Sequence, residues 1–87
     1  MADYPYISCQ ISFYPLYTKE VGEKVLEVIA IIEESGLETE SNAVATIVYG
    51  RSNEIYSLLD KISRKMDEED VDYAMNCSIS NTCGCEI

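Results

Sequence analysis

The sequence predicts a single α+β domain in which two helices cover one face of a four-stranded antiparallel sheet. Segments with the two-residue apolar repeat of strands alternate with segments that have the 3.6-residue repeat of helices, in the order βαββαβ. Right-handed crossovers place the strands of two such halves in one antiparallel sheet. The 87 residues suffice for one core only. Together these observations predict the ferredoxin-like fold for residues 1–87, with a core from about residue 5 to 80.

The first strand is predicted at residues 7–14, where apolar and polar side chains alternate strictly. One face carries the apolar set Ile7, Cys9, Ile11 and Phe13. The other face carries Ser8, Gln10, Ser12 and Tyr14. Pro15 cannot donate to a sheet ladder and should close the strand, after which Thr18 can cap a helix.

The first helix follows from an apolar stripe at helical spacing. Its members are Val21, Val25, Val28, Ile29 and Ile32. Ser35 and Gly36 supply the stop, because glycine adopts the left-handed conformation of helix ends at little cost. A short strand at 37–41 is expected to follow.

That short strand should form a hairpin with the β-rich run 43–49 around Asn42. After Gly50, either Ser52 or Asn53 can cap a second helix. The apolar positions of this helix also fit one face: Ile55, Leu58, Leu59, Ile62 and Met66. The helix should end near the acidic run 67–70.

The last strand is predicted at residues 73–80, which alternate once more. The alternation places Tyr73, Met75, Cys77 and Ile79 inward. It places Ala74, Asn76, Ser78 and Ser80 outward. Residues 81–87 are predicted to form an irregular tail.

The sheet face away from the helices should be unusually rich in uncharged polar groups. It would display Ser8, Gln10, Ser12, Tyr14, Asn76, Ser78, Ser80 and either Thr46 or its alternating neighbours. Small neutral side chains suit partial burial, since they can satisfy their hydrogen bonds without desolvating an ion. A bound small molecule or a second subunit could cover this face, and a merely solvated face is the alternative.

Composition excludes several classes of function. Sixteen acidic against six basic residues give a net charge of −10, so no nucleic-acid partner is expected. Histidine is absent, which removes imidazole catalysis and histidine-containing metal sites. The chain lacks a signal peptide pattern and any apolar run of membrane-spanning length, which predicts a soluble cytoplasmic protein without membrane insertion. No cofactor is expected.

The four cysteines do not form a strong metal motif. Cys9 and Cys77 fall on predicted inward positions, where reduced cysteine behaves as a small hydrophobe. Cys83 and Cys85 form a C-x-C that lacks the spacing or the partners typical of zinc sites. Metal handling by this tail is therefore the weakest of the open alternatives.

Tyr14 and Tyr49 stand at strand ends, where an aromatic ring could stack on a heterocycle or a cation.

Three segments together resemble the YkoF family of thiamine- and hydroxymethylpyrimidine-binding domains. They are Ile-Ser-Phe-Tyr-Pro-Leu at 11–16, Ala-Thr-Ile-Val-Tyr-Gly at 45–50, and Ala-Met-Asn-Cys-Ser-Ile-Ser at 74–80 with Cys83 beyond. The resemblance implies a cytoplasmic, non-catalytic binder of thiamine or its hydroxymethylpyrimidine precursor, linked to thiamine uptake or salvage. It also implies a homodimer or homotetramer formed through the sheets. The family's namesake has two tandem domains, so a homodimer would have to supply the second.

Carried over by position, the resemblance implies a ligand site on the open face. The residues concerned are Ser12, Tyr14, Thr46, Asn76, Ser78 and Ser80. A side-chain amide such as Asn76 or Gln10 can pair with the amino group and a ring nitrogen of an aminopyrimidine at once. The sequence-based alternative is an ACT-like regulatory or interaction module without a thiamine-related ligand.

Overall fold

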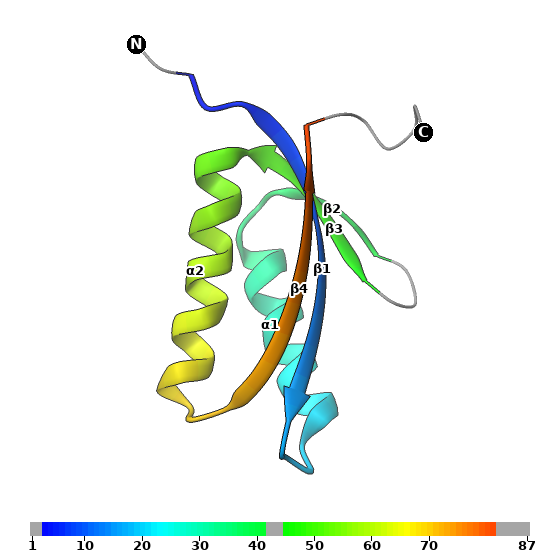
Figure 1. Ribbon diagram of the computed structural model, residues 1–87, viewed down its shortest axis with the longest axis vertical. Coiled ribbons are helices and arrows are strands. Elements are labelled where there is room, and N and C mark those ends of the chain that lie inside the picture. Colours follow the sequence, from blue (N-terminus) through cyan, green and yellow to red (C-terminus); the bar gives the residue numbers. More distant parts are fainter. Residues whose placement is uncertain (1–2, 42–44, 82–87) are drawn as a thin grey trace.

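The computed structural model describes residues 3–41 and 45–81 and has the predicted ferredoxin-like architecture (Figure 1). The elements are β1 (Tyr6–Leu16), α1 (Val21–Glu34), β2 (Glu38–Ser41), β3 (Thr46–Arg51), α2 (Ser52–Glu68) and β4 (Asp72–Ser80). The four strands form one sheet in the order β2-β3-β1-β4, and every neighbouring pair is antiparallel. Both helices lie on the same side of this sheet, which leaves the other side open (Figure 1).

The core lies between the helices and the alternate residues of the central strands. It contains Ile7, Cys9, Ile11, Val28, Ile32, Val48, Ile55, Leu58, Ile62 and Met66. Most of the apolar residues predicted for the first strand and for α2 are thus buried, and the remaining two, Phe13 and Leu59, are partly buried against this core. The larger share of the helical contribution comes from α2, because α1 buries only Val28 and Ile32 fully.

The exposed side of α1 differs from the predicted stripe. Val21 is 46% exposed and Ile29 is 38% exposed, although both belong to that stripe. The helix begins at Val21, and the Thr18 hydroxyl accepts a hydrogen bond from the Glu20 amide instead of capping the helix. A helix against one side of a sheet buries a narrow strip only, so the flanks of a broad apolar stripe remain in solvent.

Strand β1 continues through Pro15, where the sequence predicted its end. The pairing explains why proline is tolerated there. Strand β3 pairs with β1 from Tyr6 to Ile11 only, so Pro15 has a neighbour on one side, opposite Tyr73 of β4. Sheets accept proline where one side of the strand has no ladder.

The ends of α2 are fixed by local hydrogen bonds. The N-cap is Arg51, one position before Ser52 and two before Asn53, the two predicted caps, and the Arg51 amide donates to the Glu54 carboxylate. At the other end Asp70 adopts a left-handed conformation with φ of 57°. The amide of Val71 donates to the carbonyl of Met66, which completes a Schellman-type stop. The predicted end of α2 in the acidic run is confirmed.

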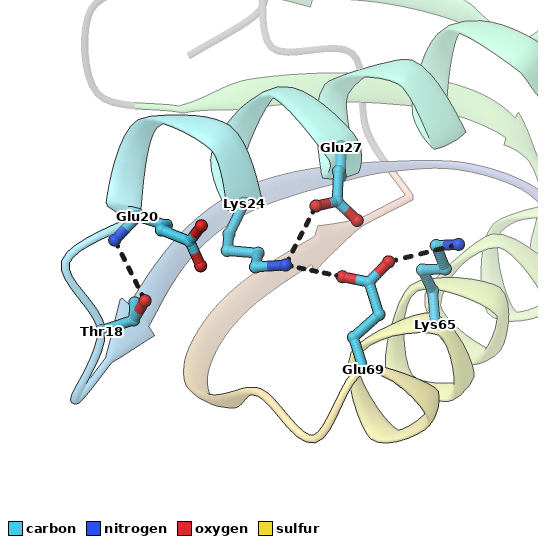
Figure 2. Close-up of polar contacts among 6 residues, drawn as sticks. All are labelled: Thr18, Glu20, Lys24, Glu27, Lys65 and Glu69. Carbon is cyan, nitrogen blue, oxygen red and sulfur yellow. Dashed lines mark hydrogen bonds and ion pairs between the residues drawn. The ribbon is translucent and has the colours of Figure 1, made fainter.

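Lys24 connects the two helices at this end of the molecule (Figure 2). Its Nζ lies 3.2 Å from a carboxylate oxygen of Glu27 and 2.9 Å from one of Glu69, and Lys65 lies 3.2 Å from the other oxygen of Glu69. The hydrogen bond from Lys24 is the main cause that lowers the pKa of Glu69 to about 2. The same contact raises the pKa of Lys24 above its ordinary value.

We expect the Lys24→Met variant to lose stability near neutral pH but not in acid. The Glu69 carboxylate, with a pKa of about 2 in the folded state, stabilises the fold above its ordinary pKa of about 4.3. That contribution is lost as the pH falls from about 4.3 to about 2. The contribution of Lys24 is lost only above about pH 10.4. Urea midpoints measured by circular dichroism should therefore differ most near pH 7 and converge in acid.

The matched control for this experiment is Arg64→Met. It removes an ion pair with Asp60 whose two side chains are largely exposed, with 2.9 Å between the charged atoms. Exposed pairs on one helix contribute little to stability, so this variant should follow the parent protein across the pH range. A constant gap between Lys24→Met and the parent protein from pH 7 to 2 would contradict the assigned role of Lys24.

Candidate functional site

The open face of the sheet carries the predicted row of uncharged polar side chains. Strand pairing sets Ser12 opposite Asn76, Gln10 opposite Ser78, and Ser8 opposite Ser80. Directly opposed residues of an antiparallel pair point to the same face. Tyr14 lies at the far end of the row, opposite Ala74, and is 48% exposed. The structure thus brings Gln10, Ser12, Tyr14, Asn76, Ser78 and Ser80 together on one surface of β1 and β4.

Placing Thr46 on the open face is wrong. Thr46 pairs with Ile11, whose side chain belongs to the buried core, so it lies on the helix side of the sheet and is half-buried. The open-face positions of β3 are Ile47 and Tyr49, opposite Gln10 and Ser8. Sequence alternation in 43–49 gave no preference between the two faces, since both sets of residues are partly apolar.

The amides of the polar row are available to a ligand. Gln10, Asn76 and Ser78 are exposed, and within the described ranges their side chains make no hydrogen bond. The Ser8 hydroxyl, in contrast, lies 3.5 Å from the carbonyl oxygen of Ser80. An amide offers a donor and an acceptor in one plane, so the middle of the row can recognise a ring that presents both.

A pocket of about 370 Å³ opens at one end of the open face and is lined by residues of all four strands and by Asn81. Its lining is Tyr6, Ile7, Ser8, Glu38, Tyr49, Ser80 and Asn81. Across the sheet, Ser8 lies between Tyr49 of β3 and Ser80 of β4, and Tyr6 is two residues before Ser8 on the same face of β1. The volume is within the range of small-molecule sites, about 300–1,000 Å³. This hollow gives the open face a concave part of a size that suits a small ligand.

Four pocket residues were not predicted as site residues: Tyr6, Glu38, Ile7, which was assigned to the apolar face, and Asn81, which was assigned to the tail. Tyr6 continues the alternation of the first strand by one step, two residues before Ser8, and that signal could have found it. Glu38 has no such signal, because it reaches the pocket only through the pairing of β2 with β3, where it lies opposite Tyr49. Tyr49 was singled out as a stacking ring and does line the pocket, whereas Tyr14 does not.

Hydrogen bonding orients one side of this pocket. The Tyr49 hydroxyl donates to a carboxylate oxygen of Glu40 at 2.8 Å, and this bond is the main cause that raises the pKa of Tyr49. The Arg51 guanidinium lies 5.7 Å from the centre of the Tyr6 ring, a cation–π distance. The face of Tyr6 therefore already holds a cation at the rim of the pocket.

The cysteines differ in their surroundings. Cys9 is completely buried, and burial followed by the neighbouring Cys77 thiol raises the pKa of Cys9 to about 12. Cys77 lies on the helix side of β4 as predicted but is exposed, which corrects its predicted burial. Within residues 3–41 and 45–81 no three metal-binding side chains form a cluster. The Cys83–Cys85 motif and all but the first residue of the predicted tail lie outside the described residues.

None of the helices described here is both long and apolar enough to cross a lipid bilayer. A model of the protein family described as YKOF-related matches residues 6–86, which is nearly the whole chain. No curated protein matches the sequence significantly.

Several solved structures share the fold at low sequence identity. A protein from Thermotoga maritima that is provisionally assigned to thiamine biosynthesis or salvage superposes with a TM-score of 0.79 at 20% identity, over 87% of this chain and 83% of that chain. A Streptococcus pneumoniae protein gives a TM-score of 0.81 at 18% identity, over 94% and 92%. A domain of unknown function from Bacillus cereus gives 0.77 at 18% identity, over 88% and 76%.

Proposed function

This chain belongs to the YKOF-related family, and we propose that it binds thiamine or its hydroxymethylpyrimidine precursor on the open face of its sheet without catalysing a reaction. The observation that carries the proposal is the row of uncharged polar side chains on β1 and β4, in which the Gln10 and Asn76 amides are exposed. A solvated face of an acidic protein would be expected to carry charges instead.

The chemistry of the row suits an aminopyrimidine. This ring presents an amino donor beside ring-nitrogen acceptors, and an amide such as Asn76 can pair with both. The hydroxyls of Ser12 and Ser78 flank Asn76 and can supply further bonds, while Thr46 has no part because it lies on the other face. Neutral amides and hydroxyls bind a ring without exchanging protons near pH 7, which supports a binding role over catalysis.

The wider role that we propose is cytoplasmic thiamine uptake or salvage, with the chain assembled as a homodimer or homotetramer through its sheets. The provisional assignment of the Thermotoga maritima protein supports the thiamine connection. An open sheet face of one copy, covered by a second copy, would enclose a ligand that a single exposed face cannot shield from water.

Thermal unfolding with and without ligand tests the proposal. We expect hydroxymethylpyrimidine and thiamine to raise the melting temperature, and calorimetric titration to give saturable binding. Ligand at about 100 times its dissociation constant adds roughly 2.7 kcal/mol, which in a domain of this size shifts the midpoint by on the order of 10 °C. Thiamine diphosphate serves as the third ligand, and shows whether phosphate is accepted. No shift with any of the three, in folded protein, would favour an ACT-like interaction module instead.

A further inference from the structure

We propose that the outward face of α1 is a docking site for a basic amphipathic helix of another protein, in which aliphatic side chains lie between lysine or arginine residues. The inference goes beyond the proposed function, because α1 lies on the opposite side of the sheet from the polar row (Figure 1). A protein partner on α1 would leave the open face accessible to a ligand.

The outward face of α1 carries aliphatic residues where a solvated helix would carry charged ones. Leu26 is 66% exposed and Ile29 is 38% exposed. Gly22 and Ala30 are exposed as well, and they lie beside Leu26 because residues four apart are neighbours on a helix. These four residues form the α1 stripe. Contiguous exposed apolar surface is typical of a site that binds another molecule.

The other helix shows what a solvated face looks like in the same domain. Helix α2 lies on the same side of the sheet as α1 (Figure 1). Charged residues are common at its exposed positions, among them Asp60, Lys61, Arg64, Lys65 and Glu68. The α1 stripe is equally outward but carries no charge. A helix that is apolar on two sides is ordinarily buried on both, so the stripe indicates a partner.

The charges around the α1 stripe favour a basic partner. Helix α1 contains four glutamates and one lysine, Lys24, which is held by Glu27 and by Glu69 of α2 (Figure 2). In the part of the chain that the structure describes, Glu23, Glu33 and Glu34 make no ion pair. A second copy of α1 or an anionic membrane would bring further negative charge to these carboxylates. Lysine and arginine side chains would pair with them instead.

The last turn of α1 strengthens this preference. Glu33 borders the α1 stripe, since it follows Ala30 by three residues and Ile29 by four. The helix ends at Glu34, and its last turn contains no basic residue. Two carboxylates therefore lie at the negative end of the helix dipole, where cations are stabilising. A basic side chain of the partner at this end would offset both the carboxylates and the dipole.

Titration with synthetic peptides tests the docking site. The probe is a helical peptide with leucines on one face and lysines on the other. Two peptides of the same pattern serve as controls, one with glutamate in place of lysine and one with glutamine in place of leucine. We expect the parent protein to bind the leucine–lysine peptide at least about 10-fold more tightly than either control. Amide chemical shifts should change on α1 and stay constant on the open face.

Leu26→Gln removes the most exposed aliphatic side chain of the α1 stripe and keeps the net charge. We expect this variant to bind the leucine–lysine peptide about 10-fold more weakly and to keep the melting temperature of the parent protein. Tyr56→Gln is the matched control, because Tyr56 is a 55% exposed residue of α2. It should bind the peptide like the parent protein.

Glu33→Gln tests the contribution of charge. We expect it to weaken binding of the leucine–lysine peptide about 2- to 5-fold, whereas Glu68→Gln, at the last residue of α2, should not weaken it. Both variants change the net charge equally, so a general attraction between an acidic protein and a basic peptide would give equal effects. Equal effects of Glu33→Gln and Glu68→Gln would contradict the charge preference.

The remaining outcomes separate a basic protein partner from other occupants of α1. Equal loss of peptide affinity in Leu26→Gln and Tyr56→Gln would overturn the docking site. If sedimentation shows that Leu26→Gln has a lower oligomeric state than the parent protein, a second copy covers α1 and the proposed partner is wrong. Binding of phosphatidylcholine vesicles by the parent protein but not by Leu26→Gln would assign the stripe to a lipid surface instead.

Discussion

Replacing Ile55 by alanine is expected to lower the free energy of unfolding by about 2–5 kcal/mol. Ile55 of α2 is 0% exposed and belongs to the core cluster beneath the sheet, so truncation leaves a cavity that a rigid helix cannot close. A domain of 87 residues has a total stability of about 4–13 kcal/mol. The loss should therefore lower the melting temperature by on the order of 10 °C or more, as followed by circular dichroism.

Ile29→Ala is the matched control, with the same change of side chain on the other helix. Its side chain is 38% exposed, so less apolar surface is lost and little cavity forms. Alanine is also the better helix former, which offsets part of the loss. We expect a cost of at most about 1 kcal/mol. Equal losses in the two variants would contradict the difference in burial between α1 and α2.

Replacing Asn76 by alanine is expected to give the largest loss of ligand affinity. The amide is the one polar group of the row that is flanked across the sheet by Ser12 and beside it by Ser78, and it can donate and accept at once. Losing two hydrogen bonds to a ligand ring raises the dissociation constant by roughly 10- to 100-fold. Titration of thiamine and hydroxymethylpyrimidine should show the same loss, because both contain the pyrimidine.

Asn53→Ala provides the control for this experiment. Asn53 is an exposed amide in the first turn of α2, away from the open face, so its removal should leave affinity unchanged. Asn76 is exposed and makes no side-chain hydrogen bond within the described ranges, so Asn76→Ala should retain the circular dichroism spectrum and melting temperature of the parent. A variant that keeps both its fold and its affinity would remove Asn76 from the site.

The fold could be predicted because its elements carry strong local patterns. Residues 7–14 alternate strictly, and α2 has an apolar stripe that matches its buried face, so element type and order followed from periodicity. The pattern could not predict how far the helices cover each strand of the sheet. Cys77 and Ile79 are on the predicted side of β4 and are nevertheless exposed, since β4 is an edge strand and nothing in a single strand's sequence tells how far the helices extend over it.

The candidate site, like the fold, could be predicted from the sequence only in part. The polar row on β1 and β4 follows from two alternating segments and their antiparallel pairing, and all its predicted members lie together. Thr46 was predicted on the wrong face of the sheet. A shift of one residue exchanges the two faces of a strand, and both faces of β3 carry apolar residues. Glu38 lines the pocket because the β2–β3 register places it opposite Tyr49, and no local sequence signal predicts that register.

The pairing of β1 with β4 has a consequence for the order of folding. This ladder joins Ser8 to Ser80 and Leu16 to Asp72, so the central strand β1 is paired along one side by an edge strand from the opposite end of the described chain. Contacts so distant in sequence are slow to form, because the intervening loop must lose entropy before they can stabilise anything. During synthesis on the ribosome, β1 would keep an unpaired edge until β4 emerges. An interrupted chain would thus expose a central strand to other nascent chains, which is a route to aggregation.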